Sequence, residues 1–498
     1  MNNNNTIQNL KKTGLTACLF LYLITGYGQQ KQWLEDPALN RVYARVLNLE
    51  INRIDNQLKQ PNSPEQIYIA GLADVLELLV TEDERKFDQY EERYESRLDQ
   101  LAARNPQTAE SLFTQAELRL QWMFTYLKFG HEFDAAWNIR QAYILVQDCK
   151  KKYPDFLPIK KTSGLLEIML GSVPEKYQWV MSLLGMEGSV NLGLSELGQV
   201  IEKCESLKLE TTLLIHLFQG FILQQTGAAM TGFESTLQAY PQNRLALFLG
   251  AAIAIKNSQS EKALTLLLEL QDKKYGLPVS YTDYQLGEVY LHKGEYKSSI
   301  QSYQKFIVDY QGKNYIKDAH YKIGVCYWLL GDSMEASRYF EKAKEEGTES
   351  AEADKYAARN LAENIYPNIK LSKIRYATDG GYYEYAKQIA GTVTDKDIPS
   401  VKEKIEFTYR KARLLHKSGS EVQAQNLYLE TITQQGEENW YFAPNACLQL
   451  AYLFSEQGQI ADAKKYFEKA LTYKKHEYKN SIDSKAKSAL AQLKKRGV

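Results

Sequence analysis

The residues most able to do chemistry in this chain do not occur in the patterns that catalysis or metal binding needs. A phosphate-binding loop requires the pattern GxxxxGK[ST], but Gly312-Lys313-Asn314 lacks the hydroxyl residue and the upstream glycine. His131-Glu132 is not followed by the second histidine of a zinc-binding helix. We predict no catalytic residue, no metal ligand and no cofactor, although two carboxylates brought together by folding would suffice for acid–base chemistry.

The cysteines also show no metal-binding pattern. Cys149, Cys204, Cys326 and Cys447 lie far apart in the chain and form no CxxC pair. We predict that they are small buried hydrophobic residues, and one disulfide in an oxidising compartment is the alternative.

The composition excludes two broad classes of protein. The chain has 498 residues, of which 44% are hydrophobic and 24% charged, as in a folded soluble protein rather than a disordered one. Lys+Arg and Asp+Glu are both 61, so no basic excess is available to follow a phosphate backbone. We therefore expect no nucleic-acid partner.

The first 28 residues have the layout of a secretory signal. The basic pair Lys11-Lys12 precedes an apolar run from Leu15 to Ile24, and Gly28 follows. That run is shorter than the roughly 20 residues of a membrane span. We predict cleavage after Gly28, and an uncleaved anchor or a buried first helix is the alternative.

The predicted destination is the periplasm or outer cell envelope of a Gram-negative bacterium. Residues 29–498 hold no Asn-x-Ser/Thr acceptor, which favours a bacterial envelope over the eukaryotic secretory route. They also hold no apolar run long enough to span a membrane. Leu15-Thr16-Ala17-Cys18 resembles a lipoprotein box, but most of the apolar run follows Cys18, so lipidation is the less favoured reading.

Helical periodicity dominates the remaining chain. Ser63-Pro64-Glu65-Gln66 marks a helix start, because Ser63 can cap the helix and Gln66 can complete a capping box. Large apolar residues recur every three or four positions from Phe87 to Leu101, and Asn105-Pro106 then ends the helix. The alternation typical of strands is rare, so we predict an all-α fold.

Four segments share one order of small and large residues, each with a glycine between two predicted helices. The copies contain Leu286, Gly287, Tyr290, Gly294, Ser299 and Tyr303; Ile323, Gly324, Tyr327, Gly331, Ala336 and Phe340; Ala412, Leu415, Gly419, Ala424 and Tyr428; and Leu450, Ala451, Phe454, Gly458, Ala463 and Phe467. This order resembles the tetratricopeptide repeat, in which small residues let two helices approach and large ones fill the space between them. The resemblance implies a right-handed superhelical solenoid of helical hairpins.

The repeats occupy the second half of the chain. We place them near residues 280–313, 317–350, 405–438 and 444–477, with an irregular hairpin at 352–392, in a region covering 271–498. Residues 29–270 form a more divergent region of helical hairpins. Within it, the stretch from Val173-Pro174 to Gly193-Leu194 faintly resembles a eukaryotic inclusion-body-clearance family of tetratricopeptide proteins, which implies a shared helical architecture over residues 109–270.

The resemblance also indicates which side chains line the inner wall of the solenoid. Carried over position by position, the candidate groove residues are Tyr281, Tyr284, Glu288, His292, Tyr321, Trp328, Tyr409, Arg413, His416 and Tyr452. The chain has 35 tyrosines, whose half-polar rings suit such a surface, although each could instead pack against a neighbouring hairpin. The set departs from the Lys/Asn pattern with which some family members hold a C-terminal carboxylate.

These observations favour a non-catalytic scaffold that holds a protein or peptide partner in an aromatic groove. A helical envelope protein that binds glycans or nutrients is the second reading, because tyrosines stack on sugar rings. An enzyme whose site is invisible in the sequence is the third. The basic residues near the C-terminus, including Lys485, are expected to form the solvated face of a capping helix rather than a surface for an anionic partner.

Overall fold

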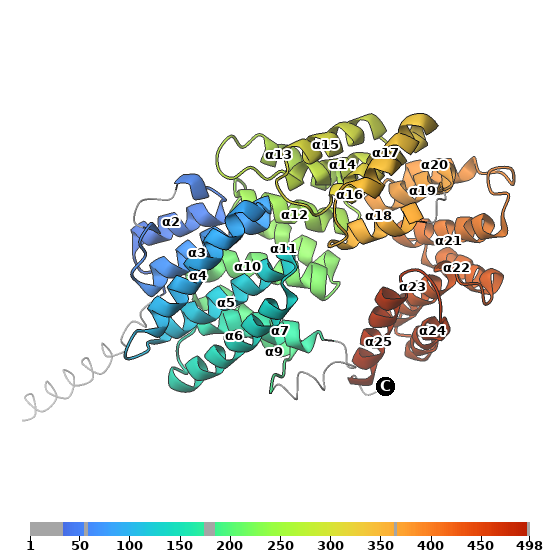
Figure 1. The fold of residues 1–498 in the computed structure, drawn as a ribbon. Helices are drawn as coiled ribbons and strands as arrows, with labels where there is room; N and C mark the ends of the chain where they lie inside the picture. Colours follow the sequence, from blue (N-terminus) through green and yellow to red (C-terminus); the bar gives the residue numbers. More distant parts are fainter. Residues whose placement is uncertain (1–32, 54–57, 174–184, 363–365, 496–498) are drawn as a thin grey trace, which may run out of the picture.

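The computed structural model describes residues 33–53, 58–173, 185–362 and 366–495, and these residues form 23 α-helices and no strand. The helices run antiparallel in pairs that stack along a curved solenoid, which confirms the predicted fold class (Figure 1). The expected signal segment and Cys18 lie outside the described residues, as does most of the stretch from Val173 to Leu184.

The front half of the solenoid runs from α2 to α13 and has one continuous apolar core, which extends from Trp33 to Val289. Three short 3₁₀ segments and one π turn lie between the helices of this half. The 3₁₀ segments are Ile51–Arg53, Glu84–Lys86 (η3) and Glu205–Leu207, and the π turn is Phe218–Ile222. Its helices are α2 Pro37–Leu47, α3 Pro64–Thr81, α4 Phe87–Ala102, α5 Ala109–Phe129, α6 Glu132–Lys152, α7 Ile159–Gly171, α9 Val190–Lys203, α10 Lys208–Leu217, α11 Thr226–Ala239, α12 Arg244–Lys256 and α13 Ser260–Gln271.

The back half runs from α14 to α25. The four predicted repeats each hold one helical hairpin, whereas the segment 352–392 holds three helices, α18 alone and the pair α19–α20. The helices are α14 Tyr281–Lys293, α15 Tyr296–Asp309, α16 Ile316–Leu330, α17 Ser333–Glu345, α18 Glu352–Ala362, α19 Ile369–Gly380, α20 Tyr383–Gly391, α21 Val401–Lys417, α22 Glu421–Gln435, α23 Phe442–Glu456, α24 Ile460–Thr472 and α25 Lys479–Lys495.

Local sequence signals set several helix ends. The Ser63 hydroxyl accepts a hydrogen bond from the Gln66 backbone N–H, and the Gln66 side-chain oxygen accepts one from the Ser63 backbone N–H, so the predicted capping box is confirmed. Gly294 and Gly331 end α14 and α16 with φ of +83° and +87°, a conformation that L-residues with a side chain rarely adopt.

Within a hairpin, a glycine of the first helix faces an aromatic ring of the second. A Cβ added to Gly287 would lie 2.7 Å from the Tyr303 ring, and one added to Gly324 would lie 2.7 Å from the Phe340 ring. The Ser299 hydroxyl donates a hydrogen bond of 2.7 Å to the Gly287 carbonyl oxygen. The contacts predicted between small and large residues are confirmed in these two hairpins.

Beyond α17 the chain turns back on itself. The pair α19–α20 packs against α14 and against the turn between α12 and α13. Gly381, with φ of +85°, lies so near that turn that an added Cβ would be 2.1 Å from the Ser258 carbonyl oxygen. The Tyr382 hydroxyl donates to Glu261 of α13 at 3.0 Å. The solenoid therefore closes on an earlier turn of its own helices.

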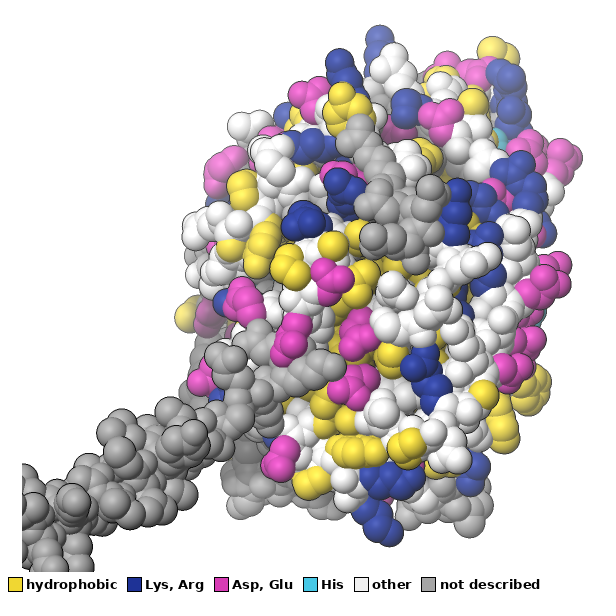
Figure 2. Space-filling model, turned by 90° about the vertical axis from the view of Figure 1, so that its left-hand side faces the viewer, with side chains coloured by type: hydrophobic (Ala, Val, Ile, Leu, Met, Phe, Trp, Pro, Cys, Tyr) yellow, Lys and Arg dark blue, Asp and Glu magenta, His cyan; other side chains and the backbone are white. Residues whose placement is uncertain are grey.

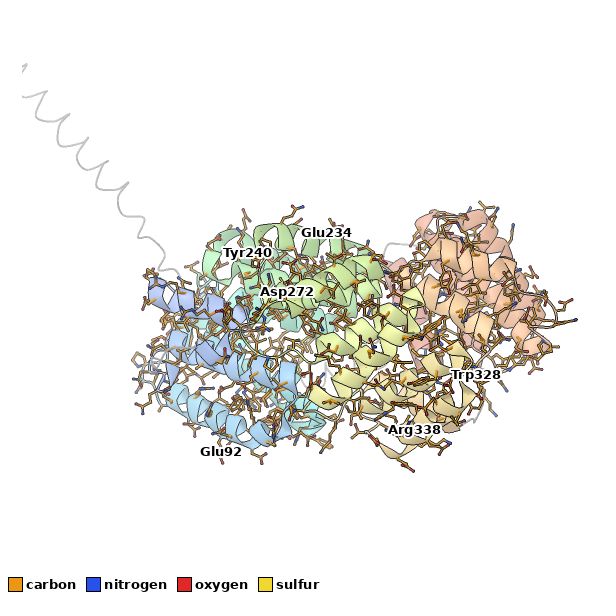
Figure 3. The ribbon with its side chains drawn as sticks, turned by 90° about the horizontal axis from the view of Figure 1, so that it is seen from above. Glu92, Glu234, Tyr240, Asp272, Trp328 and Arg338 are labelled. Atoms are coloured by element: carbon orange, nitrogen blue, oxygen red, sulfur yellow. The ribbon has the colours of Figure 1, made fainter. Side chains whose placement is uncertain are left out.

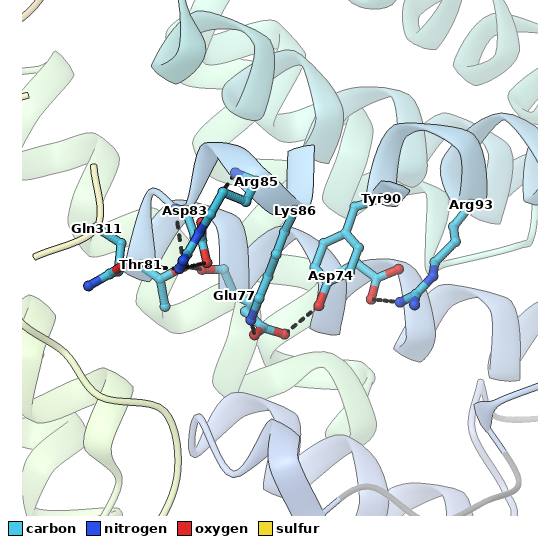
Figure 4. Close-up of polar contacts among 9 residues, drawn as sticks. All are labelled: Asp74, Glu77, Thr81, Asp83, Arg85, Lys86, Tyr90, Arg93 and Gln311. Carbon is cyan, nitrogen blue, oxygen red and sulfur yellow. Dashed lines mark hydrogen bonds and ion pairs between the residues drawn. The ribbon is translucent and has the colours of Figure 1, made fainter. Parts of the chain in front are cut away.

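A second long-range contact joins the front half to the loop between α15 and α16. Arg85 of η3 donates to Gln311 at 3.0 Å (Figure 4). Asn314 donates to Glu82 at 2.6 Å. These polar contacts connect the outer ends of hairpins that are far apart in the sequence.

The front core contains a buried polar cluster around Lys161 of α7. Its ammonium lies 2.6 Å from Glu117 of α5, 2.7 Å from Glu210 of α10 and 2.8 Å from the hydroxyl of Tyr68 of α3. The hydroxyl of Tyr43 of α2 also donates to Glu210, so five helices meet at one cation. Burial alone would lower the pKa of Lys161, but Glu117 and Glu210 raise it. The lysine is thus charged and fully paired.

The cysteines occupy the apolar interior. Cys149, Cys204, Cys326 and Cys447 are all buried and free, as predicted from their spacing.

Lys161→Met should destabilise the protein by about 3–5 kcal/mol, because it leaves Glu117 and Glu210 buried without their cation. Urea unfolding measures this loss. Lys151→Met, on the exposed face of α6, is the matched control and should stay within about 0.5 kcal/mol of wild type. Equal stability of the two variants would contradict the role of the cluster.

Gly381→Ala should destabilise the protein more than Gly419→Ala. Both glycines have φ near +84° (+85° and +84°), so both changes carry the strain of a left-handed alanine, roughly 1–2 kcal/mol. Only the Gly381 Cβ meets backbone, since an added Cβ at Gly419 has no atom within 4 Å, so we expect about 1–3 kcal/mol of additional loss. Thermal melts of the two variants test this, and identical melts would argue against docking of α19–α20.

Candidate functional site

Charged side chains from four helices form a row across the back half. We call this row the inner wall: Glu288 of α14, Lys322 of α16, Arg375 and Asp379 of α19, and Arg413 of α21. Lys322 lies 3.3 Å from Glu288, and Asp379 lies 2.9 Å from Arg413 and 3.7 Å from Arg375. Four of the five side chains are 29–30% exposed, so a partner can reach them.

The carboxylates of the inner wall are held in the charged form. Burial alone would raise the pKa of Asp379, but the guanidinium groups of Arg413 and Arg375 keep it below its ordinary value. Burial likewise opposes ionisation of Glu288, and Lys322 and His292 outweigh it and lower the pKa. The wall therefore presents fixed charges of both signs at neutral pH.

A cluster of arginines and tyrosines continues the inner wall towards the C-terminus. Arg375 donates to the Tyr356 hydroxyl of α18 at 2.8 Å, and the Tyr356 ring lies 6.1 Å from the ring of Tyr478. Tyr478 directly precedes α25 and lies 5.0 Å from the Tyr441 ring, whose hydroxyl accepts from Arg410 at 2.8 Å. The start of α25 is thus packed beside α18, as the C-terminal helices curl back in Figure 1.

Three of the ten predicted groove residues lie in the hydrophobic core. Tyr284, Tyr321 and Tyr409 are only 2%, 6% and 0% exposed. The Tyr284 ring stacks on Tyr281 at 4.9 Å, and its hydroxyl donates to Asp318 at 2.5 Å. A partner could not contact these rings without opening the hairpins, because the rings fill the space between neighbouring helices.

Four other predicted residues are held by contacts within the protein, two of them to other hairpins and two within their own hairpin. His292 is buried and lies 3.0 Å from the Ser260 hydroxyl, and His416 lies 3.2 Å from the Tyr428 hydroxyl. The Trp328 indole donates to the Pro367 carbonyl oxygen at 2.8 Å, and Figure 3 shows Trp328 on the same side of the molecule as Arg338. The half-buried Tyr452 ring lies 5.2 Å from the Phe467 ring. The structure brings Glu288 and Arg413 of the ten onto the charged row.

The sequence also contained a signal for Arg375 and Asp379, two residues of the inner wall that are not among the ten predicted groove residues. Gly381 ends its helix in the same left-handed conformation as Gly294. Arg375 and Asp379 precede Gly381 by the same intervals as Glu288 and His292 precede Gly294. Applying the repeat frame to the segment 352–392 would therefore have placed Arg375 and Asp379 on the wall.

A recess of about 990 Å³ lies between α3 and α4, at the end of the molecule opposite to the inner wall. Several of its charged groups are engaged by side chains of α3, α4 and η3. Asp74 accepts from Arg97 at 2.7 Å. It also accepts from Arg93 at 3.4 Å, and Glu77 accepts from the Tyr90 hydroxyl at 2.8 Å (Figure 4). Figure 2 shows acidic, basic and hydrophobic side chains interspersed over this end of the molecule, without a field of one sign.

Two kinds of feature are not found among the described residues. No three His, Cys, Asp or Glu side chains in the described ranges are arranged to hold a metal ion. In the same part of the chain, no helix is both long and apolar enough to cross a membrane.

The chain is similar in sequence to a known repeat family. The family model described as tetratricopeptide repeat matches residues 284–307, 317–346 and 444–477, which fall on the α14–α15, α16–α17 and α23–α24 hairpins. The copy that begins at Ile405 lies outside these matches, although α21 and α22 form a hairpin there. Among curated proteins, none matches the chain in sequence.

Solved structures resemble the chain at low identity. A human IFIT1 dimer with m7Gppp-AAAA is 13% identical, with 88% of this chain and 95% of that chain covered and a TM-score of 0.31. The APC/C hetero-tetramer Cut9–Hcn1 is 11% identical, with 91% and 95% covered and a TM-score of 0.30. The family matches and the helical hairpins on which they fall together show that the chain contains tetratricopeptide repeats at α14–α15, α16–α17 and α23–α24.

Proposed function

We propose that the chain is a non-catalytic scaffold that holds a protein partner against its inner wall. The observation that carries the proposal is the row of paired charges contributed by α14, α16, α19 and α21, in which four of the five side chains are 29–30% exposed. Fixed charges of both signs on a rigid concave surface select a partner by electrostatic complementarity and set its register. Such a surface suits an extended peptide or a helix, because either can lie along several repeats at once.

The wall favours a protein partner over a glycan. Sugar rings stack on open aromatic faces, but Tyr284, Tyr321 and Tyr409 are buried in the core. The tyrosines that remain near the wall are engaged by arginines, as Arg375 engages Tyr356 and Arg410 engages Tyr441. The likeness of residues 109–270 to the inclusion-body-clearance family adds only a shared helical architecture to this proposal.

We further place this function in the cell envelope of a Gram-negative bacterium. The support is the arrangement of residues 1–28, where a basic pair, an apolar run and Gly28 follow one another.

The double variant Glu288→Gln/Arg375→Gln should lose the partner, because it removes one wall charge of each sign and leaves the net charge unchanged. The measurement is recovery of a defined protein from bacterial envelope extract on immobilised wild type and variant, with at least a several-fold loss expected. Glu384→Gln/Lys387→Gln removes the exposed ion pair of 2.8 Å on α20 and serves as the matched control. If the folded wall variant recovers as much of the partner as wild type does, the inner wall is not the binding surface.

The protein isolated from the envelope fraction should begin at Gln29, because cleavage is expected after Gly28. N-terminal sequencing and intact mass measure this directly. A chain that begins at Met1 and fractionates with the cytoplasm would overturn the proposed location, and a lipid mass on Cys18 would replace signal cleavage by lipoprotein processing.

A further inference from the structure

The helix α6 carries apolar side chains on two opposite faces. The face with Ala142 and Val146 is buried in the front core, where α6 packs against α5 and α7. On the other face, Phe133, Trp137 and Ile144 are 92%, 57% and 45% exposed. A surface helix ordinarily keeps its outer face polar, and a helix that is apolar on both faces is ordinarily covered on both. The second face of α6 is therefore a surface for another molecule.

The three exposed residues form one stripe along the helix. In an α-helix with 3.6 residues per turn, spacings of four, seven and eleven return a side chain to nearly the same direction. Phe133, Trp137 and Ile144 have these spacings, and the exposed Lys151 continues the same line seven residues further on. The helix lies at the lower edge of the front half in Figure 1, so the stripe is open to a second macromolecule.

This stripe differs from the other apolar residues on the surface. Val308 on α15 is 78% exposed and Met334 on α17 is 75% exposed, but each is the single large apolar side chain exposed on its helix. Such isolated residues are common on soluble proteins, whereas contiguous apolar surface marks an interaction site.

The charge along α6 reverses from one end of the stripe to the other. The first turn holds Glu132 and Asp134, and the last turn holds three lysines. Of these lysines, Lys150 and Lys152 are paired within the chain at 2.7 and 2.8 Å. Lys151 and Glu132 have no ion-pair partner among the residues that the structure describes. A helix that covers the stripe therefore needs a basic end beside Glu132, an apolar middle and an acidic end beside Lys151.

We propose that α6 of a second copy of this chain covers the stripe and joins two chains in a symmetric dimer. A second α6 that runs antiparallel to the first has the required order of groups, with its Lys151 beside Glu132 and its Glu132 beside Lys151. Trp137 then lies opposite Ile144 of the second copy. Arg140, between them on the same face, is placed to stack on the Trp137 ring of the second copy. A two-fold axis through the middle of the stripe makes the two halves of the contact identical.

The change of charge along the helix favours a protein over a lipid surface. A helix that lies on an anionic membrane carries basic residues along its polar edges. Here Glu132 and Asp134 flank Phe133, the most exposed residue of the stripe, and anionic headgroups would repel that end.

The test measures self-association of the chain isolated from cells by analytical ultracentrifugation. The contact is one helix wide, which is small beside the roughly 1,200–2,000 Å² of a standard interface, so the dimer should dissociate at concentrations on the order of micromolar. Phe133→Gln/Trp137→Gln should raise the dissociation constant about tenfold or more, because both copies lose their aromatic anchors. Val308→Gln/Met334→Gln removes exposed apolar residues elsewhere and should associate like wild type. Thermal melts of both variants should match wild type, because these side chains lie on the surface.

Charge reversal tests the antiparallel direction. Glu132→Lys and Lys151→Glu each bring like charges together at two symmetric positions, so each should raise the dissociation constant about threefold or more. The double variant Glu132→Lys/Lys151→Glu restores opposite charges across the contact and should associate nearly as well as wild type.

Four results would each overturn the inference. They are a wild type that stays monomeric up to about 100 µM, a dimer that survives Phe133→Gln/Trp137→Gln, a double charge reversal that does not restore association, and binding of monomeric wild type to phosphatidylglycerol vesicles through the stripe. The last result would make lipid the occupant. None of them bears on the scaffold proposal, because the inner wall lies on helices of the back half.

Discussion

The fold depends on the close approach of two helices where a glycine meets an aromatic ring. Gly287 against Tyr303 and Gly324 against Phe340 leave no room for even one additional methyl group. Because the ring fills the space that the missing side chain leaves, each hairpin has one preferred packing distance and angle. Stacking of hairpins with a constant small rotation then gives the solenoid its curvature.

Curvature brings together groups that no local interaction would place side by side. The α19–α20 turn reaches the α12–α13 turn, with Gly381 against Ser258, and the start of α25 reaches α18, with Tyr478 against Tyr356. A rigid superhelix closes in this way only if every hairpin holds its geometry. The glycines that permit these approaches therefore matter to the concave surface as much as the charges on it.

Charge is used differently at the two ends of the molecule. In the front half, Lys161 is fully enclosed by Glu117, Glu210 and two tyrosines, and such a cluster joins five helices in one arrangement. On the inner wall, the ion pairs keep about 30% of their surface open to water. Buried pairs specify the packing of the chain, whereas partly exposed pairs are available to a partner.

The sequence by itself determined the repeat, because small and large residues at fixed intervals encode a local packing. It therefore predicted the helical hairpins, the capping box at Ser63 and two wall residues, Glu288 and Arg413. It could not separate core tyrosines from wall tyrosines, since Tyr409 differs from a groove residue only in what covers it. Only the tertiary structure decided that Tyr478 packs against Tyr356, because that contact depends on rotation accumulated over the helices between them.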